Sequence, residues 1–366
     1  MQGSDLRPDH VLSIGAGPAQ LPLICAARAA GFAVWALDRA DRPAAADLLA
    51  GHLALGTHDP ETAVAAIRRH PLAARTRAVL QRTSGPALAT AAAAAAALAV
   101  PGPATGFCAA AVRKSVLRQE AGALGLPVPA GCLARDPADL AGLPAGRYPL
   151  LVKPDMPLRG KAAVLRLQPE DRGGPAERAA VQQAAQASAN GLAEVQAWLP
   201  GRDVGLLLLL RDGAPRLALG YDEIVAQHRD GHVQGLGLAA PSACLGAAQL
   251  SALALPLARH LGMDRGFLFF SFRVGPGGTA HLYEVNPGLC GDGIADRLLP
   301  ALFPGFDPFA AEVAAWTGGE GPPLPGRPVP ATLLDGQLLP GDAAANAAAI
   351  RAAAARGGGS WTAAAA

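Results

Sequence analysis

Short apolar runs alternate with helical stretches over the first hundred residues. Val11–Ile14 is an apolar run typical of a buried strand, and a helical stretch follows it as far as Ala30. Gly31 is placed to end that helix, and a second apolar run, Phe32–Leu37, leads to Asp38. Strands that alternate with helices predict a parallel sheet whose ligand-facing loops lie at the carboxyl ends of the strands.

The first strand-to-helix turn reads Gly-Ala-Gly-Pro-Ala-Gln from Gly15 to Gln20. Glycines there let the backbone approach a ligand, and a helix N-terminus attracts anions. Asp38 stands where a ribose-binding acid lies in dinucleotide folds, but Gln20 replaces the third glycine, which such folds need for close helix–strand packing. An NAD-dependent oxidoreductase is therefore a remote alternative, and a tight turn without a ligand suits Gly15 and Gly17 as well.

The pattern changes after Pro101–Pro103, which mark a plausible domain boundary. A helix that carries Lys114 leads to a strand, Tyr148–Pro154, with Lys153 near its end. A lysine held at the end of a buried strand is a point charge suited to a phosphate oxygen. The next loop contains glycine and Lys161 and is suited to closing over phosphates, although either lysine taken alone is equally typical of an ordinary surface.

A second candidate for nucleotide contacts follows in the chain. Glu194–Gly201 reads as a strand that breaks at Pro-Gly, and Asp203 precedes the very apolar run Val204–Leu210. The edge of such a strand offers backbone groups to a flat base, and the Asp203 carboxylate is suited to ribose hydroxyls. Trp198 taken alone is more typical of a core than of a ligand site.

The strongest pattern is a hairpin near the end of the chain. Gly266–Val274 is a strand, Gly275–Gly278 a turn, and Ala280–Gly288 the returning strand. Glu284 and Asn286 are two residues apart, so both are expected on one face of that strand. Carboxylate and amide oxygens suit Mg²⁺, which also keeps waters and substrate phosphates as ligands.

The histidine nearest to this pair is interpreted as structural. His281 alternates in phase with Tyr283, so strict alternation places both on the face opposite Glu284. No Ser/His/Asp arrangement is evident elsewhere in the sequence.

Composition and charge narrow the function classes. The chain has 366 residues, enough for two or three domains or subdomains. Its formal net charge of +2 gives no electrostatic reason to expect nucleic acid or an anionic membrane as partner. The longest apolar run, Ala87–Val100, is rich in alanine and shorter than the roughly 20 residues that a membrane span needs. The five cysteines show no CxxC spacing, which is typical of a cytoplasmic protein without a disulfide framework or zinc site.

These segments, in this order, resemble the ATP-grasp superfamily from about Val11 to Leu302. The motifs are GAGPAQ with Asp38 and Ala46-Asp47, VPGP, RKSVLRQEAGALGLPVPAG, YPLLVKPD, EVQAWLPGRD and HLYEVNPG. The N-terminal part resembles carboxyaminoimidazole ribonucleotide synthase and related carboxylate–amine ligases. The last motif, with FSFRV before it, resembles D-alanine–D-alanine ligase.

The resemblance implies an α/β fold in three parts. Residues 1–103 are expected to form a Rossmann-like pre-ATP-grasp domain with a parallel sheet. Residues 104–316 are expected to form a two-subdomain ATP-grasp fold with a lid subdomain at about 130–200. Residues 317–366 are a Pro/Gly/Ala-rich tail, for which we expect a short helix around Ala343–Ala355 and disorder beyond it.

The resemblance also assigns roles to individual residues around ATP bound between two lobes. It implies that Lys114 and Lys153 contact the phosphates and that Lys161 lies on a loop that covers them. It implies an adenine hinge of Gln196, Trp198 and Leu199, and a ribose contact from Asp203. Glu284 and Asn286 are the implied ligands of Mg²⁺, with Mn²⁺ as an alternative. Arg273 matches an arginine that stabilises acyl-phosphate and tetrahedral species in the D-alanine ligase branch, so Arg273 and Lys153 are the expected catalytic residues.

Two positions depart from the family pattern. Ser271 stands where the family usually has an acidic first metal ligand, and a hydroxyl is a poorer Mg²⁺ ligand than a carboxylate. Gly288 stands where many of these ligases have arginine after Asn-Pro, and Arg297 is a candidate to replace that arginine in space.

The expected activity is ATP- and Mg²⁺-dependent activation of a carboxylate as an acyl phosphate, which an amine then attacks to give an amide. Small-molecule acids and amines are the expected partners, with no nucleic acid and no membrane, and homodimerisation is left open. Three alternatives remain: a catalytically weakened ATP-binding protein of the same fold, a bicarbonate-using carboxylase, and the remote NAD-dependent oxidoreductase.

Overall fold

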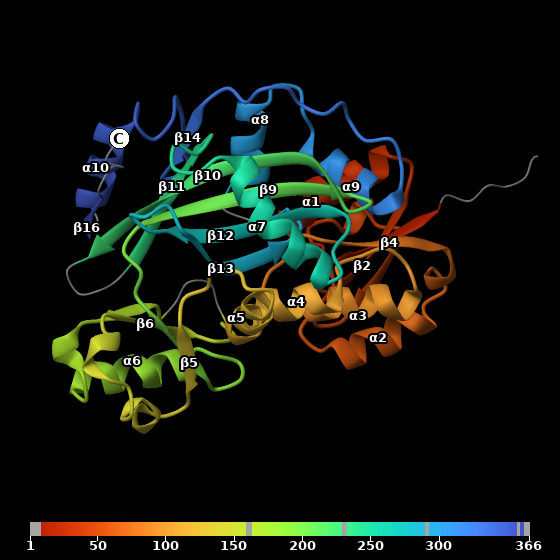
Figure 1. Cartoon of the computed structure of the whole chain (residues 1–366). Coiled ribbons are helices and arrows are strands. Elements are labelled where there is room, and N and C mark those ends of the chain that lie inside the picture. Colours follow the sequence, from red (N-terminus) through yellow and green to blue (C-terminus); the bar gives the residue numbers. More distant parts are fainter. Residues whose placement is uncertain (1–8, 159–162, 229–232, 290–292, 357–358, 362–366) are drawn as a thin grey trace, which may run out of the picture.

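The computed structural model describes residues 9–158, 163–228, 233–289, 293–356 and 359–361. Figure 1 shows a small sheet with its helices at the N-terminal end of the chain, a large sheet in the centre and a second small sheet on the opposite side. This mixed α/β architecture, with one parallel and two antiparallel sheets, confirms the expected fold class. Within these ranges, no helix is both long and apolar enough to cross a membrane.

The N-terminal sheet is parallel and has the strand order β3-β2-β1-β4. Its strands are β1 (His10–Ile14), β2 (Ala33–Asp38), β3 (Gly51–Ala54) and β4 (Thr76–Gln81). Helix α1 (Leu21–Ala29) covers one face, and α2 (Pro60–Arg69) and α3 (Ala87–Leu98) cover the other. Because both faces are covered, the two central strands, β1 and β2, are mostly apolar.

The large antiparallel sheet has the order β13-β12-β9-β10-β11-β14-β15, and the short β16 (Gly359–Ser360) pairs with β10. Its strands are β9 (Arg202–Arg211), β10 (Ala214–His228), β11 (Val233–Ala240), β12 (Gly266–Val274), β13 (Ala280–Pro287), β14 (Ala331–Leu334) and β15 (Gln337–Pro340). The hairpin of β12 and β13 confirms the strand–turn–strand pattern read from the sequence.

Each face of this sheet supports a separate core. Even-numbered residues of β9 and β12, such as Leu206 and Phe270, pack toward α7 (Ala247–His260), α4 (Thr105–Val112) and α5 (Lys114–Ala123). Odd-numbered residues, such as Leu207 and Phe269, pack toward α8 (Leu299–Leu302) and α9 (Pro308–Thr317). Toward the ends of β9 and β12 that lie near Asp203 and Arg273, the second face carries polar side chains instead.

The third sheet is antiparallel, with the order β5-β8-β6-β7. It consists of β5 (Gly131–Ala134), β6 (Leu150–Pro154), β7 (Leu165–Leu167) and β8 (Ala193–Ala197), and α6 (Pro175–Gln186) covers one face. We call this unit, residues 131–197, the lid sheet. Figure 1 places it below the β12–β13 edge of the large sheet.

The C-terminal segment contributes three strands that the sequence analysis missed, β14, β15 and the short β16. Residues of β14 pair with β11, and Gly237 permits this approach because a Cβ there would lie 1.9 Å from the carbonyl oxygen of Leu333. A left-handed turn at Asp335 and Gly336, with φ of 46° and 75°, joins β14 to β15. The expected short helix is present as α10 (Ala347–Arg356). The expectation of disorder beyond it was wrong for Gly359–Ser360, because these residues pair with β10 as strand β16, and residues 357–358 and 362–366 lie outside the described ranges.

Candidate active site

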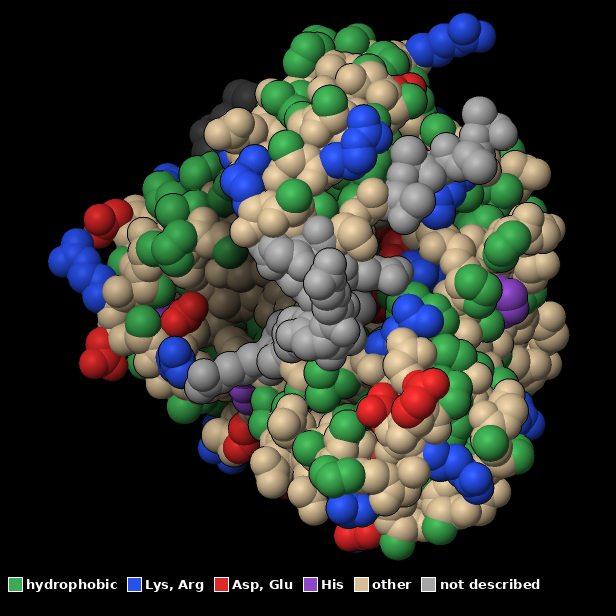
Figure 2. Space-filling view, turned by 90° about the vertical axis from the view of Figure 1, so that its left-hand side faces the viewer, with side chains coloured by type: hydrophobic (Ala, Val, Ile, Leu, Met, Phe, Trp, Pro, Cys, Tyr) green, Lys and Arg blue, Asp and Glu red, His purple; other side chains and the backbone are tan. Residues whose placement is uncertain are grey.

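Charged side chains converge where the lid sheet faces the polar end of the large sheet. Lys153 on β6 is directly opposite Glu194 on β8, and its Nζ lies 5.6 Å from the ring centroid of Tyr283 on β13. The two sheets therefore meet at Lys153. The face of the molecule in Figure 2 is hollowed at mid-height.

Lys153 is a buried cation, with only 4% of its surface exposed. The pKa of its ammonium is lowered to about 8, first by burial and then by the charge of Lys114, although Glu284, Glu194 and Asp203 act to raise it. The structure thus brings together two lysines, Lys114 and Lys153, and two carboxylates, Asp203 and Glu284, that the sequence analysis selected from distant segments. A buried ammonium next to a second cation favours an anionic ligand.

Asp155, which the sequence analysis did not select, fixes the two lysines relative to each other. Its fully buried carboxylate accepts hydrogen bonds from the backbone N–H of Ser115 at 2.8 Å and from Nδ2 of Asn190 at 2.7 Å. The backbone N–H of Lys114 donates to the carbonyl oxygen of Asp155 at 3.1 Å. The end of β6 is therefore tied to the first turn of α5.

The predicted hinge contains a buried hydrogen-bonded chain. Nε of Arg118 donates to Glu194 at 2.6 Å, and Nε2 of Gln196 donates to the same carboxylate at 3.2 Å. Glu194 has no exposed surface, and Gln196 is 3% exposed. Since the amide nitrogen of Gln196 faces Glu194, its side-chain oxygen is the atom suited to accept a bond from an exocyclic amine.

Arg273 connects the other hinge residues. Its NH1 donates to Asp203 at 2.7 Å, its Nε donates to the carbonyl oxygen of Leu199 at 3.0 Å, and its guanidinium carbon lies 4.8 Å from the ring centroid of Trp198. Arg166 on β7 lies 4.4 Å from the same ring. Three residues selected for nucleotide contacts are thus held by the arginine that was selected for catalysis, and its expected role at an acyl phosphate stays a prediction.

Glu284 and Asn286 lie together as predicted. Nδ2 of Asn286 donates to Oε1 of Glu284 at 3.2 Å, and Ser271 is the direct cross-strand partner of Glu284. The Ser271 hydroxyl donates to Glu223 on β10 at 2.8 Å. No group of three or more His, Cys, Asp or Glu placed to hold a metal ion occurs in the described part of the chain.

Glu284 and Asn286 nevertheless fit Mg²⁺. This cation is bound through one or two carboxylates and keeps several positions for water and phosphate oxygens. The hard oxygen donors of a carboxylate and an amide on one strand face match that preference, and Lys153 lies within electrostatic range of Glu284.

A β-bulge in β13 corrects the interpretation of His281. The register of β12 and β13 shifts between Ser271 and Phe272, so that Glu284 is opposite Ser271 but Leu282 is opposite Phe272. Leu282 and Val285 both pack into the core, which leaves the residues between them on the other face. His281 is paired with Arg273 and therefore lies on the same face as Glu284, so the expectation of opposite faces was wrong.

The same bulge brings Tyr283, another residue that was not selected, into the site. Burial raises the pKa of its hydroxyl well above the usual value, and the charges of Asp203, Glu223 and Glu284 raise it further. These three carboxylates therefore lie within electrostatic range of one phenol, and its ring is the group beneath the Lys153 ammonium.

The local structure explains why residue 288 is glycine, and it shows which group the Arg297 side chain contacts. Gly288 has φ of +79°, and a Cβ there would lie 2.4 Å from Nε2 of Gln81, which donates to the carbonyl oxygen of Pro287 at 2.8 Å. An arginine side chain at this position would displace Gln81. Arg297 is exposed and donates to the carbonyl oxygen of Gly336 in the β14–β15 turn. Lys161 lies outside the described residues.

The N-terminal glycine turn is closed by its own side chains. The Asp38 carboxylate accepts hydrogen bonds from the backbone N–H of Ala16 at 2.8 Å and of Ala40 at 2.9 Å. The Gln20 amide accepts from the N–H of Gly17 at 3.1 Å and donates to the carbonyl oxygen of Arg82 at 2.7 Å. These contacts favour a tight structural turn over a dinucleotide site.

Arg82 joins the N-terminal domain to the segment that follows β13. Its guanidinium donates to the carbonyl oxygens of Ala19 at 2.8 Å and Leu289 at 3.0 Å, and it forms an ion pair with Asp296. The Arg82 side chain is 6% exposed, so these bonds are largely shielded from solvent.

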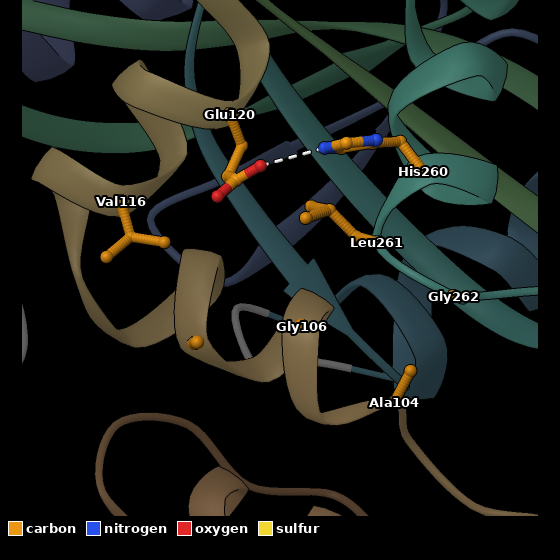
Figure 3. Close-up of a pocket in the computed structure, with 8 residues that line it drawn as sticks. Ala104, Gly106, Val116, Glu120, His260, Leu261 and Gly262 are labelled. Atoms are coloured by element: carbon orange, nitrogen blue, oxygen red, sulfur yellow. Dashed lines mark hydrogen bonds and ion pairs between the residues drawn. The ribbon is translucent and has the colours of Figure 1, made fainter. Parts of the chain in front are cut away.

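A separate pocket of about 500 Å³ lies between α4, α5 and the end of α7 (Figure 3). Its one ion pair joins Glu120 and His260 at 2.8 Å, and each of these side chains is 40% exposed. Its other lining residues are small or apolar: Ala104, Gly106, Ala109, Val116, Leu261 and Gly262. The pocket lies on the side of the large sheet opposite Glu284 and Asn286, so it is not part of the site described above.

Comparison with known proteins extends the observations on the fold. No protein-family model matches the sequence, and no curated protein matches it. Among solved structures, an ADP complex of N5-carboxyaminoimidazole ribonucleotide synthetase superposes with a TM-score of 0.70 at 16% identity, covering 91% of this chain and 83% of that chain. The L-amino acid ligase from Bacillus licheniformis gives 0.69 at 21% identity, covering 89% and 79%.

A third similar structure is the biotin carboxylase domain dimer of 2-oxoglutarate carboxylase from Hydrogenobacter thermophilus, with MgADP, ADP and bicarbonate. It gives a TM-score of 0.67 at 16% identity and covers 89% of this chain and 74% of that chain. At sequence identities of 16% and 21%, the similarity to these three structures establishes the fold of the chain and nothing finer.

Proposed function

We propose, from the premise that this chain has the ATP-grasp fold, that it is an ATP- and Mg²⁺-dependent ligase that activates a carboxylate for attack by an amine. The observation that carries the proposal is the buried Lys153 of the lid sheet, which lies within electrostatic range of Lys114 on α5 and of Glu284 on the large sheet. This arrangement places positive charge and metal-binding oxygens on the two sides of one interface.

The lysines would bind the phosphates of ATP. Lys153 has little access to water, so its ammonium gains most from an anion that replaces the missing solvent. Asp155 holds α5 against the end of β6 and so keeps Lys114 near the same place. Charge stabilisation of the transferring phosphoryl group is the main part of catalysis in this class of reaction.

The hinge would bind the nucleoside. The side-chain oxygen of Gln196 is positioned to accept a bond from the exocyclic amine of adenine, and Leu199 would contribute its backbone N–H, since its carbonyl already accepts from Arg273. Asp203 would accept from ribose hydroxyls while Arg273 fixes its carboxylate. In this assignment Arg273 acts first as a positioning residue of the hinge.

Glu284 and Asn286 would hold Mg²⁺, which when bound neutralises charge on the ATP phosphates. The substrate carboxylate would attack the γ-phosphorus to give an acyl phosphate and ADP, and the amine would then displace phosphate to give the amide. The Lys153 ammonium would face the transferring group, and no covalent intermediate with the protein is required.

A coupled assay of ADP release, run across carboxylate–amine pairs and with bicarbonate, tests this proposal. Turnover that depends on both an acid and an amine would support the ligase, whereas turnover with bicarbonate would support the carboxylase alternative. Glu284→Ala is the control: if that variant released ADP as fast as the parent protein, the assigned metal site would be wrong.

One observation favours a second candidate, a catalytically weakened ATP-binding protein. Ser271 provides a hydroxyl where the family resemblance leads us to expect an acidic ligand. An ATP-dependent increase in melting temperature without ADP release from any pair would support this candidate over the ligase.

A further inference from the structure

The proposed metal site lacks a carboxylate on β12, but a carboxylate from another strand lies at the same place. Ser271 is the cross-strand neighbour of Glu284, so a side chain at 271 faces the same region as the Glu284 carboxylate. The Ser271 hydroxyl donates to Oε1 of Glu223 at 2.8 Å. The Glu223 carboxylate therefore ends within hydrogen-bonding distance of the position where the acidic ligand is missing.

Glu223 reaches Ser271 across an intervening strand. Ser271 on β12 pairs with Gly205 on β9, and Gly205 pairs with Tyr221 on β10, two residues before Glu223. A Cβ on Gly205 would lie 1.9 Å from the Tyr221 ring. The absence of a side chain at Gly205 thus leaves this face of β9 open, and side chains of β10 extend over it toward β12.

The adjacent residue of β10 forms a similar pair on the other face. The Asp222 carboxylate accepts a hydrogen bond from the Ser242 hydroxyl at 2.6 Å and another from the backbone N–H of Ala243 at 3.1 Å. Asp222 pairs with Val204, whose side chain lies in the core beneath the sheet. The two carboxylate–serine pairs lie on opposite faces of the sheet: Glu223 meets Ser271 on the face of Glu284, whereas Asp222 lies on the face of Val204.

We propose that Glu223 supplies the carboxylate ligand that Ser271 does not provide, and that Ser271 holds Glu223 in position for a divalent cation bound with ATP. The inference rests on the proposed function, because the cation is the one that accompanies the nucleotide. Glu223, Glu284 and Asn286 then give two carboxylates and an amide around the phosphates, a set of hard oxygen donors that suits Mg²⁺ or Mn²⁺.

The test measures metal binding directly. Full-length protein saturated with a non-hydrolysable ATP analogue is titrated with Mn²⁺, and free Mn²⁺ is followed by electron paramagnetic resonance. Glu223→Gln keeps an oxygen that accepts from Ser271 but removes the charge, and we expect it to weaken Mn²⁺ binding by about tenfold or more. Asp222→Asn, the matched change on the other face, is expected to leave Mn²⁺ binding within about twofold of the parent, because Asp222 lies outside the proposed site.

A second variant moves the carboxylate back to β12. Ser271→Asp in the Glu223→Gln background is expected to restore most of the lost Mn²⁺ affinity, which a purely structural role for Glu223 does not predict. Equal Mn²⁺ affinity for the parent, Glu223→Gln and Asp222→Asn would overturn the inference but leave the proposed function intact. A parent protein that binds neither the analogue nor Mn²⁺ would overturn both.

Discussion

The guanidinium of Arg273 and the carboxylate of Asp203 form an ion pair of 2.7 Å across β9 and β12, and each side chain is 12% exposed. Because Arg273 also donates to the Leu199 carbonyl, this pair holds the hinge segment on the large sheet. A pair this shielded is expected to matter more for stability than a pair in solvent.

Arg273→Ala is therefore expected to lower the free energy of unfolding by about 3 kcal/mol, because it leaves the Asp203 carboxylate shielded without its counter-charge. Urea denaturation measures the effect. Arg265→Ala is the matched control: Arg265 pairs with Asp212, whose side chain is 73% exposed, so a loss below about 1 kcal/mol is expected. Equal losses would contradict the distinction between the two pairs.

Lys153→Met should have opposite effects on stability and on nucleotide binding. Removal of a buried ammonium relieves its desolvation, so we expect a higher melting temperature for the free protein together with ATP binding weakened by about tenfold or more. Arg147→Met removes a cation from an exposed position of the lid and should alter neither quantity. Differential scanning fluorimetry with and without ATP gives both readouts. A lower melting temperature for Lys153→Met would show that the ammonium is well paired.

Glu312 on α9 gives a prediction about pH. Burial raises the pKa of its carboxyl to about 7 from the usual 4.5, although the N–H groups of Trp316 and Phe267 donate to it. A raised folded-state pKa means that the folded protein holds this proton more tightly than the unfolded chain. The contribution of Glu312 to stability is therefore full below about pH 4.5, declines as pH rises toward about 7 and is constant above that.

The size of this effect is at most about 3 kcal/mol, from a shift of about 2.5 units at 1.36 kcal/mol per unit. Glu312→Gln cannot ionise, so the unfolding free energy of the parent should fall relative to that of the variant between pH 5 and 7. Denaturant titrations at several pH values test this. A difference that stays constant over that range would mean that Glu312 is ionised in the folded protein.

Gly288→Arg, which restores the residue that many of these ligases carry, is expected to destabilise the chain. The position has φ of +79°, and the new Cβ would meet the Gln81 side chain at 2.4 Å. We expect a loss of about 1–3 kcal/mol in unfolding free energy and no gain in ATP turnover. Gly277→Arg, in the open β12–β13 turn, has no atom within 4 Å of its Cβ and should be tolerated. A fully stable Gly288→Arg protein would contradict the steric explanation.

The sequence was sufficient for features that depend on local pattern. The parallel N-terminal sheet and the β12–β13 hairpin follow from apolar runs and from the turn residues between them. Glu284 and Asn286 share a face because they lie on the same side of the bulge in β13. For these elements, residues that are close together in the sequence determine the local structure.

The features that sequence analysis missed depend on partners far away in the chain. The bulge that brings His281 and Tyr283 to the site is defined by pairing with β12, and a period of two cannot reveal one inserted residue. Glu223 on β10 meets Ser271 on β12 across the intervening strand β9, so the contact depends on the pairing of three strands. By contrast, Asp335-Gly336 between two apolar runs is a local hairpin signal that could have predicted β14 and β15.

Arg82 has a consequence for motion within the molecule. Its side chain is bonded to Ala19 within the N-terminal domain and, outside that domain, to Leu289 just beyond β13 and to Asp296, so relative displacement of the N-terminal domain and the β13 end would break two contacts together. These two parts are therefore expected to behave as a single rigid base, and any closure over a bound nucleotide falls to the lid sheet alone. The reacting groups would then be aligned by one hinge movement rather than by two independent ones.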